Sequence, residues 1–232
     1  MSLYYNNLPS QGRGVSDDSP PSPGARVRRH PERAAYDRET IDAILDEGLV
    51  GHLGLVSDGQ PYVMPMLYAR AGDRLYLHGS PQSRLLSAVA AGAPICFTVT
   101  LLDGLVLARS AFRHSLNYRS VVILGQAWAV RDAREKLDAL RMLVDHVMTG
   151  RAEQVRAPSA PELKVTEVAA LDLRVASAKA RAGPPADNPD DYSLPVWAGE
   201  LPLGLSTGAP VPDARCRVPT PPSLRAYSRG RA

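Results

Sequence analysis

Residues 49–80, LVGHLGLVSDGQPYVMPMLYARAGDRLYLHGS, decide the fold, because two turn signals divide them into three runs rich in Val, Leu, Met and Tyr. The first signal is the Asp58-Gly59 pair, a dipeptide that favours two-residue β-hairpins. The second is AGD at residues 71–73, which places a glycine between two apolar runs. The stretch therefore predicts three antiparallel strands, over residues 49–57, 60–70 and 74–79.

Three helices are expected around this block. Residues 37–47 carry Ile41, Ile44 and Leu45 at helical spacing, and Gly48 is a natural stop. A short helix is expected over residues 81–91. Residues 132–148 have the pattern of an amphipathic helix, in which apolar side chains recur every three or four residues. Its stripe consists of Leu137, Leu140, Val144 and Val147.

The remaining apolar runs predict strands. PICFTVTLLDGLVLARSAF at residues 94–112 is interpreted as a strand, a turn at Asp103-Gly104 and a return strand. HSLNYRSVVILGQAWAV at residues 114–130 indicates one long strand, and KVTEVAALDLRVASAKARAG at residues 164–183 indicates one more. Residues 190–204 are expected to form a short irregular or helical end segment.

Six or seven strands with tight hairpins and few helices predict a mainly β (α+β) domain, an antiparallel barrel. Strands and helices do not alternate regularly, which argues against a doubly wound nucleotide-binding fold. The expected domain covers residues 30–204. Residues 1–29 and the basic, Pro-rich residues 205–232 have little apolar pattern and are expected to be disordered tails.

Composition narrows the class of protein further. No run approaches the roughly 18 apolar residues of a membrane span, and the first residues lack the apolar core of a signal peptide. The two cysteines suggest no disulfide scaffold, so a reducing cytoplasmic location and no membrane partner are expected. The net charge is only +3, and few aromatic residues accompany the basic tails, so nucleic-acid binding is not expected.

An anion site is one interpretation of YLHGSPQSRLL at residues 76–86. Ser80 has the chemistry of a helix N-cap and Pro81 suits the first helical position, so free backbone amides would follow. Such a helix start binds phosphate, and Arg84 could add a charged fork. The alternative is an ordinary capped helix with a solvated arginine.

A second polar cluster lies in HSLNYRS at residues 114–120, at the entrance of an otherwise apolar strand. Polar groups are costly to bury unpaired, so the cluster lines either a site or an exposed loop. Arg119 and Arg109 could reach the same anion as Arg84, or could be surface arginines at strand ends. Pro65 interrupts an apolar strand and marks an edge or a bulge.

His78 shares one strand face with Tyr76, while Leu75 and Leu77 share the other. If the leucines face the core, His78 faces a groove or solvent; alternatively it is a structural histidine bonded to a carbonyl. The five histidines are scattered, and no metal site can be derived from their spacing.

These motifs together resemble a known family. HPERAAYDRETIDAILDEG, GHLGLV, DGQPYVMPMLYAR, DRLYLHGSPQSRLL and VTLLDGLVLARSAFRHSLNYRSVVILG are similar, in this order, to the pyridoxamine 5′-phosphate oxidase-like FMN-binding split barrels. The nitroimidazole-resistance branch is the most similar, and the resemblance covers about residues 29–204. It implies a six-stranded split barrel that forms a homodimer with FMN in each dimer groove.

The resemblance also implies roles for particular residues. The flavin phosphate would meet Ser80, Ser83 and Arg84, and the ring would lie against residues 63–66. Asn117 and Arg119 would approach the flavin of the partner subunit, Trp197 would cover the ring, and His78 would lie near it as the catalytic proton donor. The implied cofactor-binding residues are Val63, Met64, Pro65, Met66, Ser80, Ser83, Arg84, Asn117, Arg119 and Trp197.

Two functions follow from this resemblance. The first is a flavin-dependent oxidoreductase that exchanges two electrons with a small organic substrate, for example a nitroaromatic compound. The second is a non-enzymatic flavin or heme carrier or sensor, with His78 or His114 as an axial heme ligand. Heme and deazaflavin are the alternatives to FMN in the family. The residues that hold vitamin B6 in true pyridoxamine phosphate oxidases are not recognisable, because LDGLVLARSAFRHS occupies that region.

Overall fold

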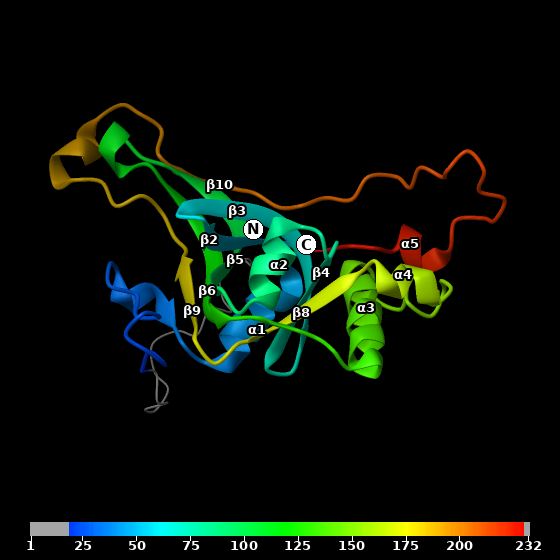
Figure 1. The fold of residues 1–232 in the computed structure, drawn as a ribbon. Helices are drawn as coiled ribbons and strands as arrows, with labels where there is room; N and C mark the ends of the chain where they lie inside the picture. Colours follow the sequence, from blue (N-terminus) through cyan, green and yellow to red (C-terminus); the bar gives the residue numbers. More distant parts are fainter. Residues whose placement is uncertain (1–18, 230–232) are drawn as a thin grey trace.

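The computed structural model describes residues 19–229, and these form a curved, antiparallel sheet with helices at its ends and side (Figure 1). The strand order is β1-β9-β6-β5-β2-β3-β4-β8-β7, and β10 adds to β5. The strands are β1 (Ala34–Ala35), β2 (Val50–Ser57), β3 (Gln60–Ala71), β4 (Arg74–Gly79), β5 (Pro94–Leu107), β6 (Ser115–Gln126), β7 (Trp128–Ala129), β8 (Glu167–Asp172), β9 (Ala176–Arg181) and β10 (Gly199–Pro202). The expected mainly β, antiparallel class is confirmed.

The helices are short apart from two. They are α1 (Arg38–Glu47), α2 (Arg84–Ala90), α3 (Ala133–Val147), α4 (Ala160–Lys164) and α5 (Pro222–Arg225), with 3-10 turns η1 (Pro31–Arg33), η2 (Ala111–Arg113) and η3 (Pro189–Ser193). In Figure 1, α3 and α4 lie together at the side of the sheet, beside β4 and β8. Within the described residues, no helix is both long and apolar enough to cross a membrane.

The predicted β2–β3–β4 block is confirmed nearly residue for residue. Ser57 pairs with Gln60 across the turn, and Asp58 and Gly59 both have positive φ, at 52° and 76°. This is the backbone that a two-residue hairpin needs, and Asp and Gly tolerate it. The next turn contains Gly72 with φ 55°.

The prediction of a hairpin at Asp103-Gly104 is wrong. β5 runs unbroken through both residues, and only its register to β6 shifts between Leu102 and Gly104. The cause is tertiary: a Cβ on Gly104 would lie 3.1 Å from the carbonyl oxygen of Leu201, so the glycine admits β10 at close range. Asp-Gly here makes a bulge where a third strand approaches.

Two other expectations differ from the structure. Residues 164–183, expected as one strand, form β8 and β9, which lie in different parts of the sheet. The end segment, expected to be irregular or helical, contains the 3-10 turn η3 but also the strand β10. In both cases alternation in the sequence did not reveal which neighbour each strand would pair with.

The core lies inside the curved sheet and is closed by α1 and α2. Leu75 and Leu77 point into it, as their alternation predicted, whereas Tyr76 points to a second cluster beneath α3. Tyr68 is fully buried, and its hydroxyl bonds the carbonyl oxygens of Leu45 and Gly48, at 2.6 and 3.0 Å. These bonds attach the end of α1 to β3, as unpaired helix carbonyls require.

The predicted tails fall partly outside the described residues. Residues 1–18 and 230–232 lie beyond them, so that part of the prediction carries no structural statement. Residues 203–221 form an exposed arc that leaves β10 and returns through α5 to the side of α3 (Figure 1). The domain boundaries at residues 30 and 204 stay predictions.

Candidate functional site

The start of α2 does not have the cap predicted for it. Ser83, not Ser80, is the N-cap, and its hydroxyl accepts a hydrogen bond from the amide of Leu86 at 3.1 Å. The hydroxyl of Ser80 accepts from the amide of Gln82 at 3.2 Å, so Ser80 organises the turn before the helix. The Ser80-Pro81 pair is compatible with a helix start, but α2 begins one turn later, after Ser83.

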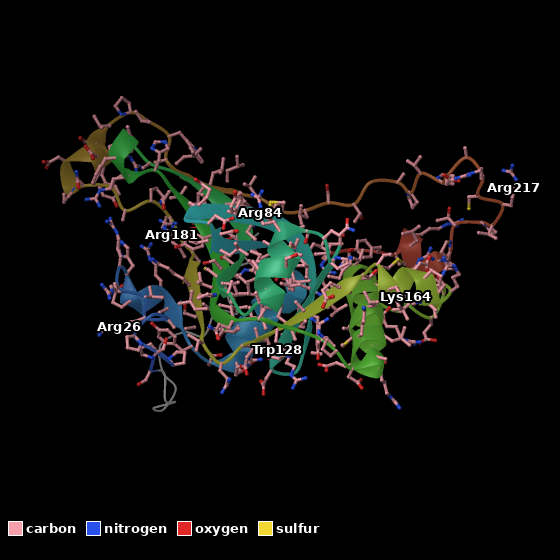
Figure 2. The ribbon with its side chains drawn as sticks, viewed as in Figure 1. Arg26, Arg84, Trp128, Lys164, Arg181 and Arg217 are labelled. Atoms are coloured by element: carbon pink, nitrogen blue, oxygen red, sulfur yellow. The ribbon has the colours of Figure 1, made fainter. Side chains whose placement is uncertain are left out.

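Arg84 is exposed at this helix start (Figure 2), and its guanidinium lies over an aromatic ring of β3. Its guanidinium carbon is 4.8 Å from the centre of the Tyr62 ring. A guanidinium over a tyrosine face gains a modest cation–π attraction, which holds its orientation without using its N–H donors. The contact with Tyr62 therefore leaves those donors able to bind a ligand.

Next to Arg84, β3 has a free edge. Residues 60–67 pair with β2, but β4 pairs with β3 only from Tyr68 to Ala71. Among the described residues, the outer backbone groups of the edge therefore have no sheet partner, and Pro65 lies in its middle. Val63 and Met64 are 65% and 49% exposed. An apolar surface with free backbone groups beside an arginine can hold a flat, polar-edged ligand.

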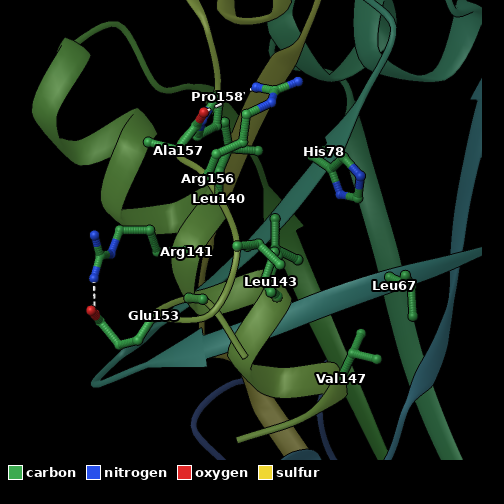
Figure 3. Close-up of a pocket in the computed structure, with 13 residues that line it drawn as sticks. Leu67, His78, Leu140, Arg141, Leu143, Val147, Glu153, Arg156, Ala157 and Pro158 are labelled. Carbon is green, nitrogen blue, oxygen red and sulfur yellow. Dashed lines mark hydrogen bonds and ion pairs between the residues drawn. The ribbon is translucent and has the colours of Figure 1, made fainter. Parts of the chain in front are cut away.

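His78 lines a cavity of about 410 Å³ that also includes Leu67, at the end of the β3 edge (Figure 3). The walls come from β3, from α3 and from the segment that follows α3. They comprise Leu67, Leu140, Arg141, Leu143, Val144, Val147, Ala152, Glu153, Val155, Arg156, Ala157 and Pro158. The lining is therefore mostly aliphatic, with His78 as its aromatic nitrogen donor.

Among the described residues, one nitrogen of the His78 imidazole has no hydrogen-bond partner. Its Nδ1 atom is buried with no hydrogen bond, and burial lowers the pKa of the ring from its ordinary value. A buried polar atom without a partner costs stability and calls for an explanation. Of the two alternatives drawn from the sequence, the carbonyl-bonded structural histidine is not found at Nδ1 among the described residues.

Two ion pairs lie at the mouth of the cavity. Arg141 pairs with Glu153, and Arg156 binds both carboxylate oxygens of Glu162, at 2.6 and 2.8 Å. The guanidinium holds the pKa of Glu162 below its usual range. Both pairs are exposed, so each contributes little to stability, and the arginines can exchange partners at small cost.

Arg119 and Asn117, expected near a flavin, are engaged by other side chains. Arg119 is 9% exposed and binds the carboxylates of Glu47 and Asp103, which raise its pKa. Asn117 is fully buried between Glu200, 2.6 Å from its amide nitrogen, and Arg181. Their contact with the flavin of a partner subunit stays a prediction. Within a single chain, these two side chains connect β6 to the elements packed around it.

The remaining candidates lie apart from one another. Arg109 bonds the buried carboxylate of Asp187 at 3.0 Å, so within the described chain it does not join Arg84 at one anion. The Nδ1 of His114 lies 3.0 Å from the carbonyl oxygen of Ser110. Trp197 is 68% exposed, and its role stays a prediction. Among the described residues no metal-binding cluster of His, Cys, Asp and Glu exists.

Sequence reasoning missed two sets of residues. The sequence predicts α3 as an amphipathic helix but does not indicate that part of its apolar stripe, including Val144 and Val147, lines the cavity. The second omission is Tyr62, whose ring makes the cation–π contact with Arg84. The signal for Tyr62 was available, because an aromatic residue next to a free strand edge and an arginine after the following strand can meet across a hairpin.

Comparison with known proteins identifies relatives. The family model described as pyridoxamine 5′-phosphate oxidase matches residues 37–180. The structure of the flavocytochrome Anf3 from Azotobacter vinelandii is 42% identical, covers 90% of this chain and 99% of its own, and superposes with a TM-score of 0.85. The FAD and heme binding protein from Mycobacterium smegmatis is 36% identical over 85% of this chain and 98% of its own, with a TM-score of 0.81.

A more distant match shares the fold. A structure from Bacteroides thetaiotaomicron, assigned to 5-nitroimidazole antibiotic resistance, is 23% identical over 63% of this chain and 85% of its own, with a TM-score of 0.54. No curated protein matches the chain. The resemblance drawn from the sequence motifs is confirmed by these matches.

Proposed function

The chain belongs to the pyridoxamine 5′-phosphate oxidase family, and from this premise we propose that it is a flavin-dependent oxidoreductase that also binds heme. The flavin would lie at the β3 edge and the heme in the cavity at His78. The observation that carries the proposal is the unpartnered Nδ1 of His78 in an aliphatic cavity. The proposed reaction is a two-electron exchange with a small planar organic substrate, in the cytoplasm.

The residues at the β3 edge fit a flavin nucleotide. The exposed apolar side chains of Val63 and Met64 offer a surface for the ring, and the free backbone groups around Pro65 can bond its polar rim. Arg84, held over Tyr62, can bind the phosphate next to the ribityl chain, which FMN and FAD share. When bound, a flavin supplies hydride chemistry at its N5 atom.

The cavity residues fit heme. Neutral imidazole is a common axial ligand of heme iron, and burial keeps His78 neutral by lowering its pKa. The aliphatic side chains that α3 contributes to the cavity would exclude water from a bound porphyrin. Arg141 and Arg156 at the mouth can bind its two carboxylates in place of their glutamate partners. Heme supplies one-electron chemistry when bound.

Two similar structures support two cofactors. One relative is a flavocytochrome and the other an FAD and heme binding protein, and this chain covers nearly all of both. A homodimer is proposed as well, because Val56, Val63, Leu116 and Leu201 are exposed apolar side chains on neighbouring strands. His78 would then serve as the heme ligand, which replaces the proton-donor role first expected for it.

A second candidate function is a non-enzymatic flavin and heme carrier or sensor. It rests on the same cavity, because a histidine between aliphatic walls binds heme whether or not a substrate can enter. The two functions differ in turnover: an oxidoreductase consumes a reductant continuously in the presence of a nitroaromatic, a quinone or dioxygen, whereas a carrier does not.

The test is the absorbance spectrum of the purified protein, followed by reconstitution with flavin and hemin. We expect flavin bands and a Soret band in one preparation, each titrating to one equivalent per chain. The His78→Ala variant should keep the flavin and lose the Soret shift that marks axial ligation. A protein that takes up flavin but no hemin contradicts the heme site, and one that takes up neither contradicts the whole proposal.

A further inference from the structure

The C-terminal segment Tyr227–Arg229, here called the C-terminal clasp, is attached to the ends of two helices. The guanidinium of Arg229 donates to the carbonyl oxygens of Asp46, Glu47 and Gly48, each at 3.0 Å, and to that of His146. The Tyr227 hydroxyl donates to the carbonyl oxygen of Val147 at 2.8 Å.

Helix chemistry explains why a cation is held there. The last carbonyls of a helix have no partner within the helix, and the helix dipole makes this end partially negative. A guanidinium has five N–H donors in a plane, so Arg229 can serve the ends of α1 and α3 together. A lysine ammonium has three donors and cannot span the same set.

The point of attachment is the junction between two walls of the His78 cavity. The end of α3 forms one wall with Val144 and Val147, and residues 152–158 form the facing wall. The chain reverses between them, and the carboxylate of Asp145 accepts from the amide of Ala152 at 2.8 Å. Fixing the end of α3 therefore fixes how far apart the two walls stand.

We infer that Arg229 and Tyr227 are positioning residues for the cavity: by clasping the end of α3, they hold its walls in place and slow the escape of its ligand. The inference rests on the proposed function for the identity of that ligand, which is heme. Neither residue touches the cavity, because neither lies among its lining side chains.

The first experiment measures how fast hemin leaves the loaded full-length protein, by capture with excess apomyoglobin. We expect Arg229→Ala to accelerate hemin loss about tenfold, since lost charge-assisted hydrogen bonds cost about one factor of ten. Tyr227→Phe, which removes only the hydroxyl, should accelerate it about threefold. Arg225→Ala is the matched control, because this exposed arginine lies in the same segment.

Two readouts separate positioning from a general loss of stability. The Soret spectrum and the flavin affinity should be unchanged in Arg229→Ala, since neither His78 nor the β3 edge is altered. Equal hemin loss in all variants overturns the inference. Parallel loss of flavin and hemin with a lower melting temperature also overturns it, because that pattern shows general destabilisation.

Hydrogen exchange tests the clasp without any cofactor. In the cofactor-free protein, backbone amides of residues 144–158 should exchange faster in Arg229→Ala than in Arg225→Ala or the unaltered chain. Unchanged exchange would overturn the clasp even if hemin binds. Faster exchange in a protein that binds no hemin keeps the clasp and rejects only heme as the ligand.

Discussion

The guanidinium of Arg84 lies 4.8 Å from the centre of the Tyr62 ring, joining the start of α2 to the free edge of β3. The two residues belong to different elements, and their contact orients the exposed arginine toward the strand edge. The first prediction concerns this pair.

Arg84→Ala should weaken flavin binding by about 1.5–3 kcal/mol, the scale of a hydrogen bond to a charged group. Fluorescence titration of the cofactor-free protein measures the dissociation constant. Arg134→Ala, at a highly exposed arginine of α3, is the control and should bind flavin normally. Unchanged affinity in Arg84→Ala would remove this arginine from the site.

His78→Ala should abolish axial ligation of hemin while flavin affinity changes less than twofold. The reason is spatial: the cavity of His78 includes only Leu67 of the β3 edge, and the proposed flavin residues Val63, Met64 and Arg84 do not line it. The Soret band and the flavin titration report the two sites separately. Equal loss of both cofactors would show that His78 belongs to one shared site.

The unfolding free energy of the cofactor-free protein should fall as the pH drops below about 6.5. Burial lowers the pKa of His78 and of His146 below the ordinary value of 6.5, so the unfolded chain binds more protons there. Stability is thus complete above that pH and is lost as the pH falls through the folded pKa values.

Urea denaturation at several pH values measures this dependence. His78→Gln should flatten it, while the control His52→Gln, at an exposed position on β2, should leave it as in the unaltered chain. A dependence that is identical in all three proteins would exclude His78 as its source.

Arg119→Ala should destabilise the protein by about 3 kcal/mol, because the substitution removes the nearly buried guanidinium that binds the carboxylates of Glu47 and Asp103. Thermal and urea unfolding measure the loss. The unfolding free energy of Arg119→Lys should lie between those of the unaltered protein and Arg119→Ala. If Arg119→Ala weakens flavin binding and leaves stability intact, Arg119 acts on the cofactor as first expected rather than on the sheet.

Local sequence patterns predicted those parts of the fold that local chemistry controls. The backbone preferences of Asp58 and Gly59 are sufficient to specify a hairpin turn, and this prediction is confirmed. The same dipeptide at residues 103–104 failed as a turn because β10, about a hundred residues later in the chain, packs against Gly104. A pattern cannot reveal a neighbour that the chain brings in from a distance.

The candidate site also has parts that the sequence predicts and parts that depend on distant contacts. The family motif predicts a role for the stretch around Ser83 and Arg84, but only the structure shows that Arg119 binds Glu47 and Asp103. The cavity at His78 was also hidden, because an apolar stripe on α3 has the same spacing whether it packs on a core or lines a space.

The clasp has a consequence for the order of events during synthesis. Arg229 lies 83 residues after His146, its partner at the end of α3. At translation rates of roughly 5–20 residues per second, those residues take about 4–17 s to add. The sheet and α3 can emerge and pack during that interval while the cavity is still unfastened. Under the proposed function, a ligand could therefore enter the growing chain for several seconds before Arg229 fastens the end of α3.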